Sequence, residues 1–366
     1  MKKKHILIIS ANCVCLIIFA VLSIISASIA NSFDSQHVVE KWSTESYSKF
    51  SYISCFFSAD KKIDKYKIYS ARSQIETQLM TEALIYVTDN TDAVSWTDAY
   101  STEGEMSVDK DGKSADVNVS AVAGNYFLFH QLDMISGGYF YDDDLMKDRV
   151  IIDDYLAWQL FGSNDIIGMT MNIEGHPFII AGIYKRPDSK YINYTYGEKS
   201  HIYMYFDTYC NMRTDASITA YEICMPNPIK SFAKDLTVKS LSLSDKDKDY
   251  TVIESSKRFS AEVMNNFVKN FNKKFIVDSN VYYPFWENSQ RAAEVDVANL
   301  FKYRIIFLIP TVLTVVIYLI IGAVWCRKNT KKILNKCKNI FISIIKGGKR
   351  LFSKKNNSRI KANNVV

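Results

Sequence analysis

Two stretches of the chain consist almost entirely of apolar side chains. The first, Ile6 to Ala30, is interrupted only by Ser, Asn and Cys, and neither it nor the second, Ile305 to Cys326, contains a charged residue. A helix needs about 20 residues to cross a hydrocarbon core of about 30 Å, and both stretches meet that length. The absence of charge also fits, because a charged side chain at the bilayer centre costs at least about 2.5 kcal/mol. The pattern predicts two transmembrane helices, 6–30 and 303–326, on either side of a region at 31–302.

Basic residues flank both apolar stretches on the sides that face the chain ends. Lys2, Lys3 and Lys4 precede the first stretch, and the segment 327–366 is rich in Lys and Arg but has no Asp or Glu. By the positive-inside rule, 1–5 is a cytoplasmic N-terminus, 327–366 is a basic cytoplasmic tail, and 31–302 is extracytoplasmic. The net charge of +6 combines these basic ends with an acidic region between them. It therefore gives no indication of nucleic-acid binding.

The first apolar stretch also has the general pattern of a cleavable signal peptide. Ser28 and Ala30 are small residues before Asn31, as in a cleavage site. The stretch is longer than the usual apolar region of about 7–15 residues in a signal peptide. We therefore expect a retained anchor, with cleavage as the alternative.

The first half of the region 31–302 changes from mixed to strand-like patterning. The aromatic-rich segment 31–68 is expected to extend the first helix as a helical stalk, and apolar residues have helical spacing over 70–87. Asp111-Gly112 lies between two strand-like segments, 93–108 and 115–122. Asp-Gly is a strong hairpin signal at such a position, so the sequence predicts a β-hairpin here.

The second half contains a capped helix and a second hairpin. Asp153 or Asp154 is placed to cap a helix that ends at Gly162, and Glu174-Gly175 joins strands 169–173 and 177–184. The sequence also predicts a short helix or turn at 124–130 and extended segments at 133–135, 149–152 and 201–206. A β-α-β unit is predicted at 217–225, 228–243 and 250–254. Helices are predicted at 258–275 and at 286–301, and the second of these continues into the second apolar stretch. The β-α-β unit predicts a partly parallel sheet.

The sequence contains no catalytic motif. There is no P-loop, because Gly347-Gly348-Lys349 lacks the earlier glycine, and there is no G-x-S-x-G or H-E-x-x-H. The histidines are scattered along the chain: His5, His37, His130, His176 and His201. We therefore predict no catalytic residue, no cofactor site and no metal site.

Three residue groups allow a second interpretation. Six aspartates, Asp142–Asp144, Asp148, Asp153 and Asp154, could supply oxygen ligands to calcium, but without EF-hand spacing a solvated loop with helix caps is preferred. Tyr191, Tyr194 and Tyr196 are expected in a surface loop, with glycan or peptide binding as the alternative. Of the three extracytoplasmic cysteines, Cys210 and Cys224 could form one disulfide.

The basic tail has helical apolar spacing. Its apolar positions are Ile333, Leu334, Cys337, Ile340, Phe341 and Ile344. Lysines lie on the other face, which predicts an amphipathic helix on the anionic inner leaflet. Binding of a partner is the alternative role.

Four segments resemble, in order, the extracytoplasmic core domain of MacB/FtsX-type ABC transporter permeases. They are Val119 to Phe127 (VSAVAGNYF), Gly138 to Phe140, Val150 to Gly162 (VIIDDYLAWQLFG) and Asp165 to Ile183. The resemblance implies an α+β, two-lobed MacB-like core domain in a bacterial cell membrane. It also implies a non-catalytic permease-like subunit that transmits mechanical work, or binds a peptide, lipid or envelope partner, together with a cytoplasmic ABC ATPase.

The chain departs from that family in its membrane part. Family permeases have four spans, three of them after the outer domain, whereas this sequence has one apolar stretch there. Either the basic tail takes the place of the segment that contacts the ATPase, or the chain pairs with a full-length permease. The alternative function is a membrane-anchored sensor or adhesion ectodomain with no transporter role.

Overall fold

The computed structural model describes residues 2–42, 49–82, 95–244, 249–271 and 280–362, with the backbone alone from 331 onward. The chain divides into two compact units. One comprises Leu22–Lys302, and the other comprises Met1–Val21 with Tyr303–Val366. Each unit is described by itself below.

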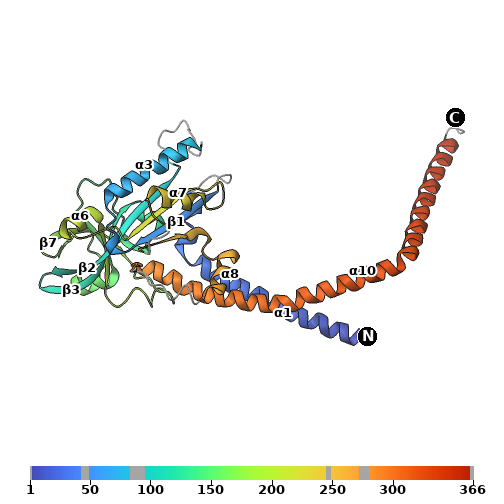
Figure 1. Cartoon of the computed structure of the whole chain (residues 1–366), viewed down its shortest axis with the longest axis horizontal. Helices are drawn as coiled ribbons and strands as arrows, with labels where there is room; N and C mark the ends of the chain where they lie inside the picture. The colour runs from blue at the N-terminus through green and yellow to red at the C-terminus, as the bar shows by residue number, and fades with distance from the viewer. Residues whose placement is uncertain (1, 43–48, 83–94, 245–248, 272–279, 363–366) are drawn as a thin grey trace. The chain divides into compact units, whose positions relative to one another are not determined.

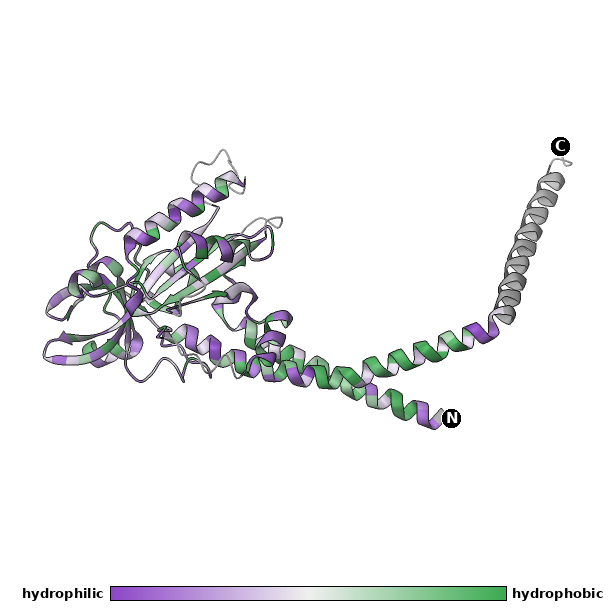
Figure 2. Cartoon of the chain, in the orientation of Figure 1, coloured by the Kyte–Doolittle hydropathy of each residue, from purple (hydrophilic) through white to green (hydrophobic). Residues whose placement is uncertain are grey.

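Within the described part of the chain, two helices are long and apolar enough to cross a membrane. They are α1 (Lys2–Asn31) and α10 (Phe285–Ala362), and their most apolar windows have a mean hydropathy of 2.7. Figure 2 shows apolar residues along most of α1 and along the middle of α10. Within the smaller unit, Asn12 Nδ2 donates to Thr314 Oγ1 at 3.2 Å, so an amide–hydroxyl contact links the two helices.

The larger unit is built on one ten-stranded mixed sheet in the order β10-β1-β9-β2-β3-β8-β5-β7-β4, with β6 pairing β2 and β7. The strands are β1 (Phe50–Phe57), β2 (Thr97–Lys110), β3 (Lys113–Gly124), β4 (Met134–Gly137), β5 (Arg149–Asp153), β6 (Thr170–Ile173), β7 (His176–Tyr184), β8 (His201–Tyr205), β9 (Ala220–Pro226) and β10 (Tyr250–Glu254). Because β6 bridges β2 and β7, the circuit β2-β3-β8-β5-β7-β6 closes on itself. The α+β class is confirmed. All ten strands belong to one continuous sheet.

Helices cover both faces of this sheet. One face packs against α3 (Lys65–Thr81), α5 (Asp154–Phe161), α6 (Phe206–Met212) and α7 (Phe232–Ser240), and α3 and α7 lie together on it (Figure 1). The other face packs against α2 (Val38–Trp42) and α4 (Tyr126–Phe129). Alternate residues of a strand reach opposite cores: Ile223 of β9 joins the first core and Cys224 joins the second.

The turn and cap residues adopt the conformations that the sequence predicts. Asp111-Gly112 and Glu174-Gly175 have positive φ at both positions, as a two-residue type I′ hairpin turn requires. Asp153 caps α5 by accepting a hydrogen bond from Leu156 N at 2.8 Å, and Gly162 ends that helix at φ +70°. Both hairpins and the capped helix are confirmed.

The expected helical stalk at 31–68 is wrong. Residues 34–36 and 38–42 are short helical turns, 43–48 lie outside the described residues, and 50–57 form β1, which lies between β9 and β10. Ile53, Cys55 and Phe57 face one core, while Tyr52 and Phe56 pack on the opposite face. With both faces buried, the strand shows no apolar–polar alternation in the sequence.

Other predictions need smaller corrections. The helix expected over 70–87 is α3, with 83–87 outside the described residues. The helix expected over 258–275 corresponds to α8 (Ala261–Lys269), and 272–275 lie outside the described residues. The β-α-β unit is confirmed. Its strands β9 and β10 are parallel to each other because both run antiparallel to β1, which lies between them.

The Cys210–Cys224 disulfide is not formed, and both residues are free thiols. Cys210 packs beside the core on one face of the sheet, and Cys224 belongs to the core on the other face. The sheet therefore separates the two sulfur atoms, which a disulfide would need within bonding distance.

Candidate functional site

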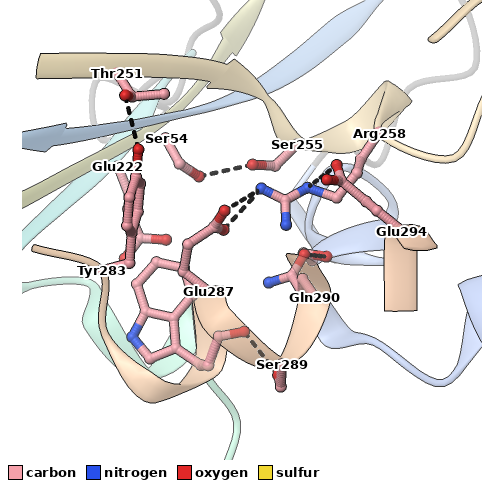
Figure 3. Close-up of polar contacts among 12 residues, drawn as sticks. Ser54, Glu222, Thr251, Ser255, Arg258, Tyr283, Glu287, Ser289, Gln290 and Glu294 are labelled. Carbon is pink, nitrogen blue, oxygen red and sulfur yellow. Dashed lines mark hydrogen bonds and ion pairs between the residues drawn. The ribbon is translucent and has the colours of Figure 1, made fainter. Parts of the chain in front are cut away.

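A buried ion pair joins the start of α10 to the end of β10. Arg258 follows the short helix η3 (Ser255–Lys257), and its Nη2 donates to both carboxylate oxygens of Glu287 at 2.7 Å (Figure 3). Arg258 Nε also lies 3.5 Å from Glu294 Oε1. Glu287 and Glu294 are about two turns apart on α10, so they lie on the same helix face. One cation therefore fixes both the position and the rotation of the first turns of α10.

Neutral hydrogen bonds extend the cluster to the segment that follows α1. Ser35, in the short helix η1 (Asp34–Gln36), donates to Gln290 Oε1 at 2.7 Å, and Gln36 donates to the carbonyl of Ser255 at 2.8 Å. Ser54 of β1 lies 2.7 Å from the hydroxyl of Ser255. We call Ser35, Ser54, Ser255, Arg258, Glu287, Gln290 and Glu294 the Arg258 cluster. It connects four segments that are far apart in the sequence.

Burial dominates the electrostatics of the Arg258 cluster. Arg258 and Glu287 are fully buried, and desolvation raises the pKa of Glu287 to about 7, while the Arg258 charge opposes that rise. Among the described residues, Arg258 Nη1 has no hydrogen-bond partner. Removing one member of a buried pair leaves an uncompensated charge, so the cluster is a strong constraint on the fold.

A second buried carboxylate lies beside this cluster. Glu222 of β9 accepts hydrogen bonds from Tyr52 and from His130 Nε2, the latter at 2.8 Å. The His130 ring packs on Trp286 of α10 with 4.1 Å between ring centroids. Trp286 also packs on Phe56 of β1. The start of α10 is therefore held by aromatic contacts as well as by ions.

A cavity of about 320 Å³ lies next to these aromatic contacts. Its aromatic walls are His130, Tyr184, Tyr203, Phe285 and Trp286. Its charged lining residues are Asp34, Asp133, Lys185, Arg186 and Asp188. Ligand pockets in proteins start at about 300 Å³ and combine apolar walls with a few polar groups, which is the pattern found here.

Ser120, His201 and Glu103 form a group that superficially resembles a catalytic triad. The Ser120 hydroxyl lies 2.7 Å from both His201 Nε2 and Glu103 Oε1. In a triad the carboxylate orients the imidazole through the second ring nitrogen, whereas His201 Nδ1 has no partner among the described residues. Burial lowers the pKa of His201 to about 3 and raises the pKa of Glu103 to about 8. The group is sealed in the core and supports structure, not nucleophilic catalysis.

The acidic residues that suggested calcium have other roles. Asp144 accepts from the Tyr205 hydroxyl at 2.6 Å, Asp142 lies 3.3 Å from Lys147 Nζ, and Asp153 caps α5. No group of three or more His, Cys, Asp or Glu that could hold a metal occurs within the described part of the chain. The preferred interpretation, a loop with helix caps, agrees with these contacts.

The tyrosine segment is only partly a surface loop. Tyr191 and Tyr196 are buried, whereas Tyr194 is 79% exposed. Tyr196 bonds to the Tyr184 hydroxyl at 2.6 Å and so supports one wall of the cavity. No local pattern in the sequence indicates that Arg258, Glu287 and His130 lie close together. For Arg258 and Glu287 the local signal is their charge within the predicted helices 258–275 and 286–301.

Comparison with known proteins gives one family. The sequence signature of the MacB-like periplasmic core domain matches residues 7–223, more than half of the chain. No curated protein sequence matches the chain.

Solved structures give distant likenesses. The extracellular domain of the noncanonic ABC-type transporter YknZ from Gram-positive bacteria has 16% identity and a TM-score of 0.37, covering 55% of this chain and 99% of that chain. The periplasmic region of MacB from Actinobacillus actinomycetemcomitans has 15% identity and a TM-score of 0.40, covering 60% and 93%. A domain of a putative permease protein from Porphyromonas gingivalis has 10% identity and a TM-score of 0.32, covering 57% and 90%.

The first prediction concerns Arg258. Arg258→Met leaves Glu287 buried without its cation, so we expect a loss of about 3–5 kcal/mol in the free energy of unfolding. The matched control is Arg213→Met, because Arg213 pairs with Glu174 at the surface, where a pair contributes about 0–1 kcal/mol. Urea unfolding of the full chain in micelles measures both variants. Equal midpoints for the two variants would contradict the structural role of the Arg258 cluster.

The second prediction concerns pH. Since burial raises the pKa of Glu103 from its ordinary 4.5 to about 8, the folded state holds a proton that the unfolded state releases. Stability should therefore fall as pH rises from about 4.5 to 8. Glu103→Gln stays neutral, so its melting temperature relative to the natural protein should be higher at pH 8 than at pH 5.

The control for this pH effect is Glu105→Gln, at an exposed position on the same strand. Its melting temperature relative to the natural protein should be independent of pH over this range. His201 stays neutral when folded in both proteins, and its contribution cancels in the comparison. If Glu103→Gln and Glu105→Gln behave alike, Glu103 is ionised in the folded state and the assignment is wrong.

Proposed function

Because the chain belongs to the MacB-like periplasmic core domain family, we propose that it is a non-catalytic, permease-like membrane subunit of an ABC-type assembly whose outer domain transmits motion through α10. The protein is a plasma-membrane protein by family and by its two apolar helices. The observation that supports transmission is the buried attachment of α10 to the sheet, through the Arg258 cluster.

The proposed topology keeps the boundaries that the sequence predicts. Residues 1–5 and 327–366 are cytoplasmic, 6–30 and 303–326 cross the bilayer, and 31–302 form the extracytoplasmic domain. The basic residues on the two cytoplasmic flanks support this orientation. The tail is proposed to lie on anionic lipid, where each Lys or Arg near the surface contributes about 1 kcal/mol.

Motion can reach the sheet through α10 only if the helix has no hinge. α10 runs from Phe285 to Ala362 with Pro310 inside it, and no Gly or Pro interrupts the stretch from Asn288 to Ile309. Its early turns also pack on α8, through Val297 and Ala298 against Met264 and Phe267. A change in tilt or rotation of these turns would have to move η3, α8 and the β10 side of the sheet with it.

The proposed partners are the lipid bilayer and a cytoplasmic ABC ATPase, a full-length permease, or both. The chain itself supplies no nucleotide-binding motif, so energy has to come from a partner. No role in nucleic-acid binding is proposed. The alternative function is an anchored sensor or adhesion ectodomain, and the cavity beside α10 is the observation that favours a ligand-binding role of that kind.

The third prediction tests whether transmission of motion requires a continuous helix α10. Lys302→Gly with Tyr303→Pro places a hinge in α10 without changing its length, since a proline inside a helix costs about 3 kcal/mol. Both side chains are exposed, so the domain should still fold. The matched control is Lys302→Ala with Tyr303→Ala, which keeps the helix. After affinity purification from native membranes into nanodiscs, ATP hydrolysis by the co-purified complex is measured.

We expect an ABC ATPase to co-purify with the natural chain and with both variants. The rate of ATP hydrolysis by the complex should change only with the hinged variant. Unchanged hydrolysis in the hinged variant would contradict transmission through α10. Co-purification of neither an ATPase nor a four-span permease would favour the anchored ectodomain.

The fourth prediction tests the topology. In a background without native cysteines, single cysteines at Asn193 and Ser353 are labelled in intact cells with a membrane-impermeant maleimide. Asn193 is exposed on the outer domain and should react, whereas Ser353 in the tail should react only after lysis. Labelling of Ser353 in intact cells would refute the arrangement with both ends in the cytoplasm.

A further inference from the structure

The aromatic walls of the cavity are held in place by their own packing. Tyr184 and Tyr203 come from neighbouring parts of the sheet, with 5.5 Å between their ring centroids, and Trp286 packs on His130 at 4.1 Å. The Tyr184 hydroxyl is held by the Tyr196 hydroxyl at 2.6 Å. These rings therefore cannot collapse into the space between them, and the cavity is preformed.

Both signs of charge lie at the mouth of this cavity. Lys185 N donates to the carbonyl of Asp133 at 2.8 Å, which places the two residues side by side where β7 ends and β4 begins. Both residues are exposed, and neither side chain has an ion-pair partner among the residues that the structure describes. The other charges are engaged: Asp34 pairs with Lys41 at 3.1 Å, and Arg186 lies over the Tyr196 ring. Asp188 accepts a hydrogen bond from Asn193 Nδ2 at 2.9 Å.

This combination restricts the chemistry of a ligand. Three carboxylates disfavour an anion, and two cations disfavour a ligand with several positive charges. A purely apolar ligand would desolvate Asp133 or Lys185 without replacing their hydrogen bonds to water. A neutral ligand with an apolar ring face can pack on the aromatic walls. Hydrogen-bond donors and acceptors around its edge can bond to Asp133 and Lys185 at the same time.

We propose that the cavity is a saccharide-binding site that takes one or two sugar rings. The C–H face of a sugar packs on the aromatic walls, and its hydroxyl or amide groups donate to Asp133 and accept from Lys185. The volume of about 320 Å³ limits the site to a short segment of a glycan. Since Phe285 and Trp286 form part of the walls, an occupied site contacts the start of α10. The binding itself does not depend on coupling to a transporter.

The test uses the full chain in lipid nanodiscs, because the sugar head groups of maltoside and glucoside detergents would compete for the same site. Isothermal titration with chitotriose and with maltotriose measures binding, and a zwitterionic dipeptide is titrated in parallel. We expect saturable binding of at least one saccharide. Asp133→Asn and Lys185→Met should each weaken it about tenfold, since the first leaves only a neutral acceptor and the second removes the charged donor.

The controls are Asp143→Asn and Lys269→Met, which change exposed charges away from the cavity and should leave the affinity unchanged. Three outcomes overturn the proposal: no binding of either saccharide, saccharide binding that neither cavity variant weakens, or binding of the dipeptide alone. Because no ATPase is present, failure here is separate from failure of the proposed transporter role.

Discussion

The burial of the Arg258 guanidinium is the constraint on which the arrangement of the larger unit depends. A cation cannot be placed in a protein interior without compensating charge, and here the compensation comes from Glu287 and Glu294 on α10. Purely apolar contacts would tolerate small shifts of α10 along its axis. The two carboxylates admit one rotation and one register, and the bond between Ser35 and Gln290 then fixes the segment after α1 against the same helix.

The sheet provides the rigid body to which this attachment is made. Closure of the circuit through β6 removes a free edge from β2 and β7, and helices or aromatic layers cover both faces. The side with β1, β9 and β10 extends beyond the closed circuit, and it is this side that leads through η3 to Arg258. The attachment of α10 is therefore made at the open end of the sheet.

The buried titratable groups of the domain stabilise structure and are not arranged for catalysis. Glu222 is shared by Tyr52 and His130, and Asp153 is held by backbone N–H groups of Leu156 and His201. These hydrogen bonds fix the geometry of the side chains involved. The cavity beside α10 is where aromatic walls and charged side chains lie together.

The sequence by itself determined the features that depend on neighbours in the chain. Asp111-Gly112 and Glu174-Gly175 specify their turns through backbone conformations that few residues adopt, Asp153 caps the helix that directly follows it, and length and apolarity identify the two long helices. Tertiary structure decided the rest. Strand β1 has no alternation because both its faces are buried, so local pattern suggested a helix. The Arg258–Glu287 pair joins residues 29 apart, and the His130–Glu222 pair joins residues 92 apart. Which charges meet at such separations is set by strand order and helix placement, and no local propensity encodes it.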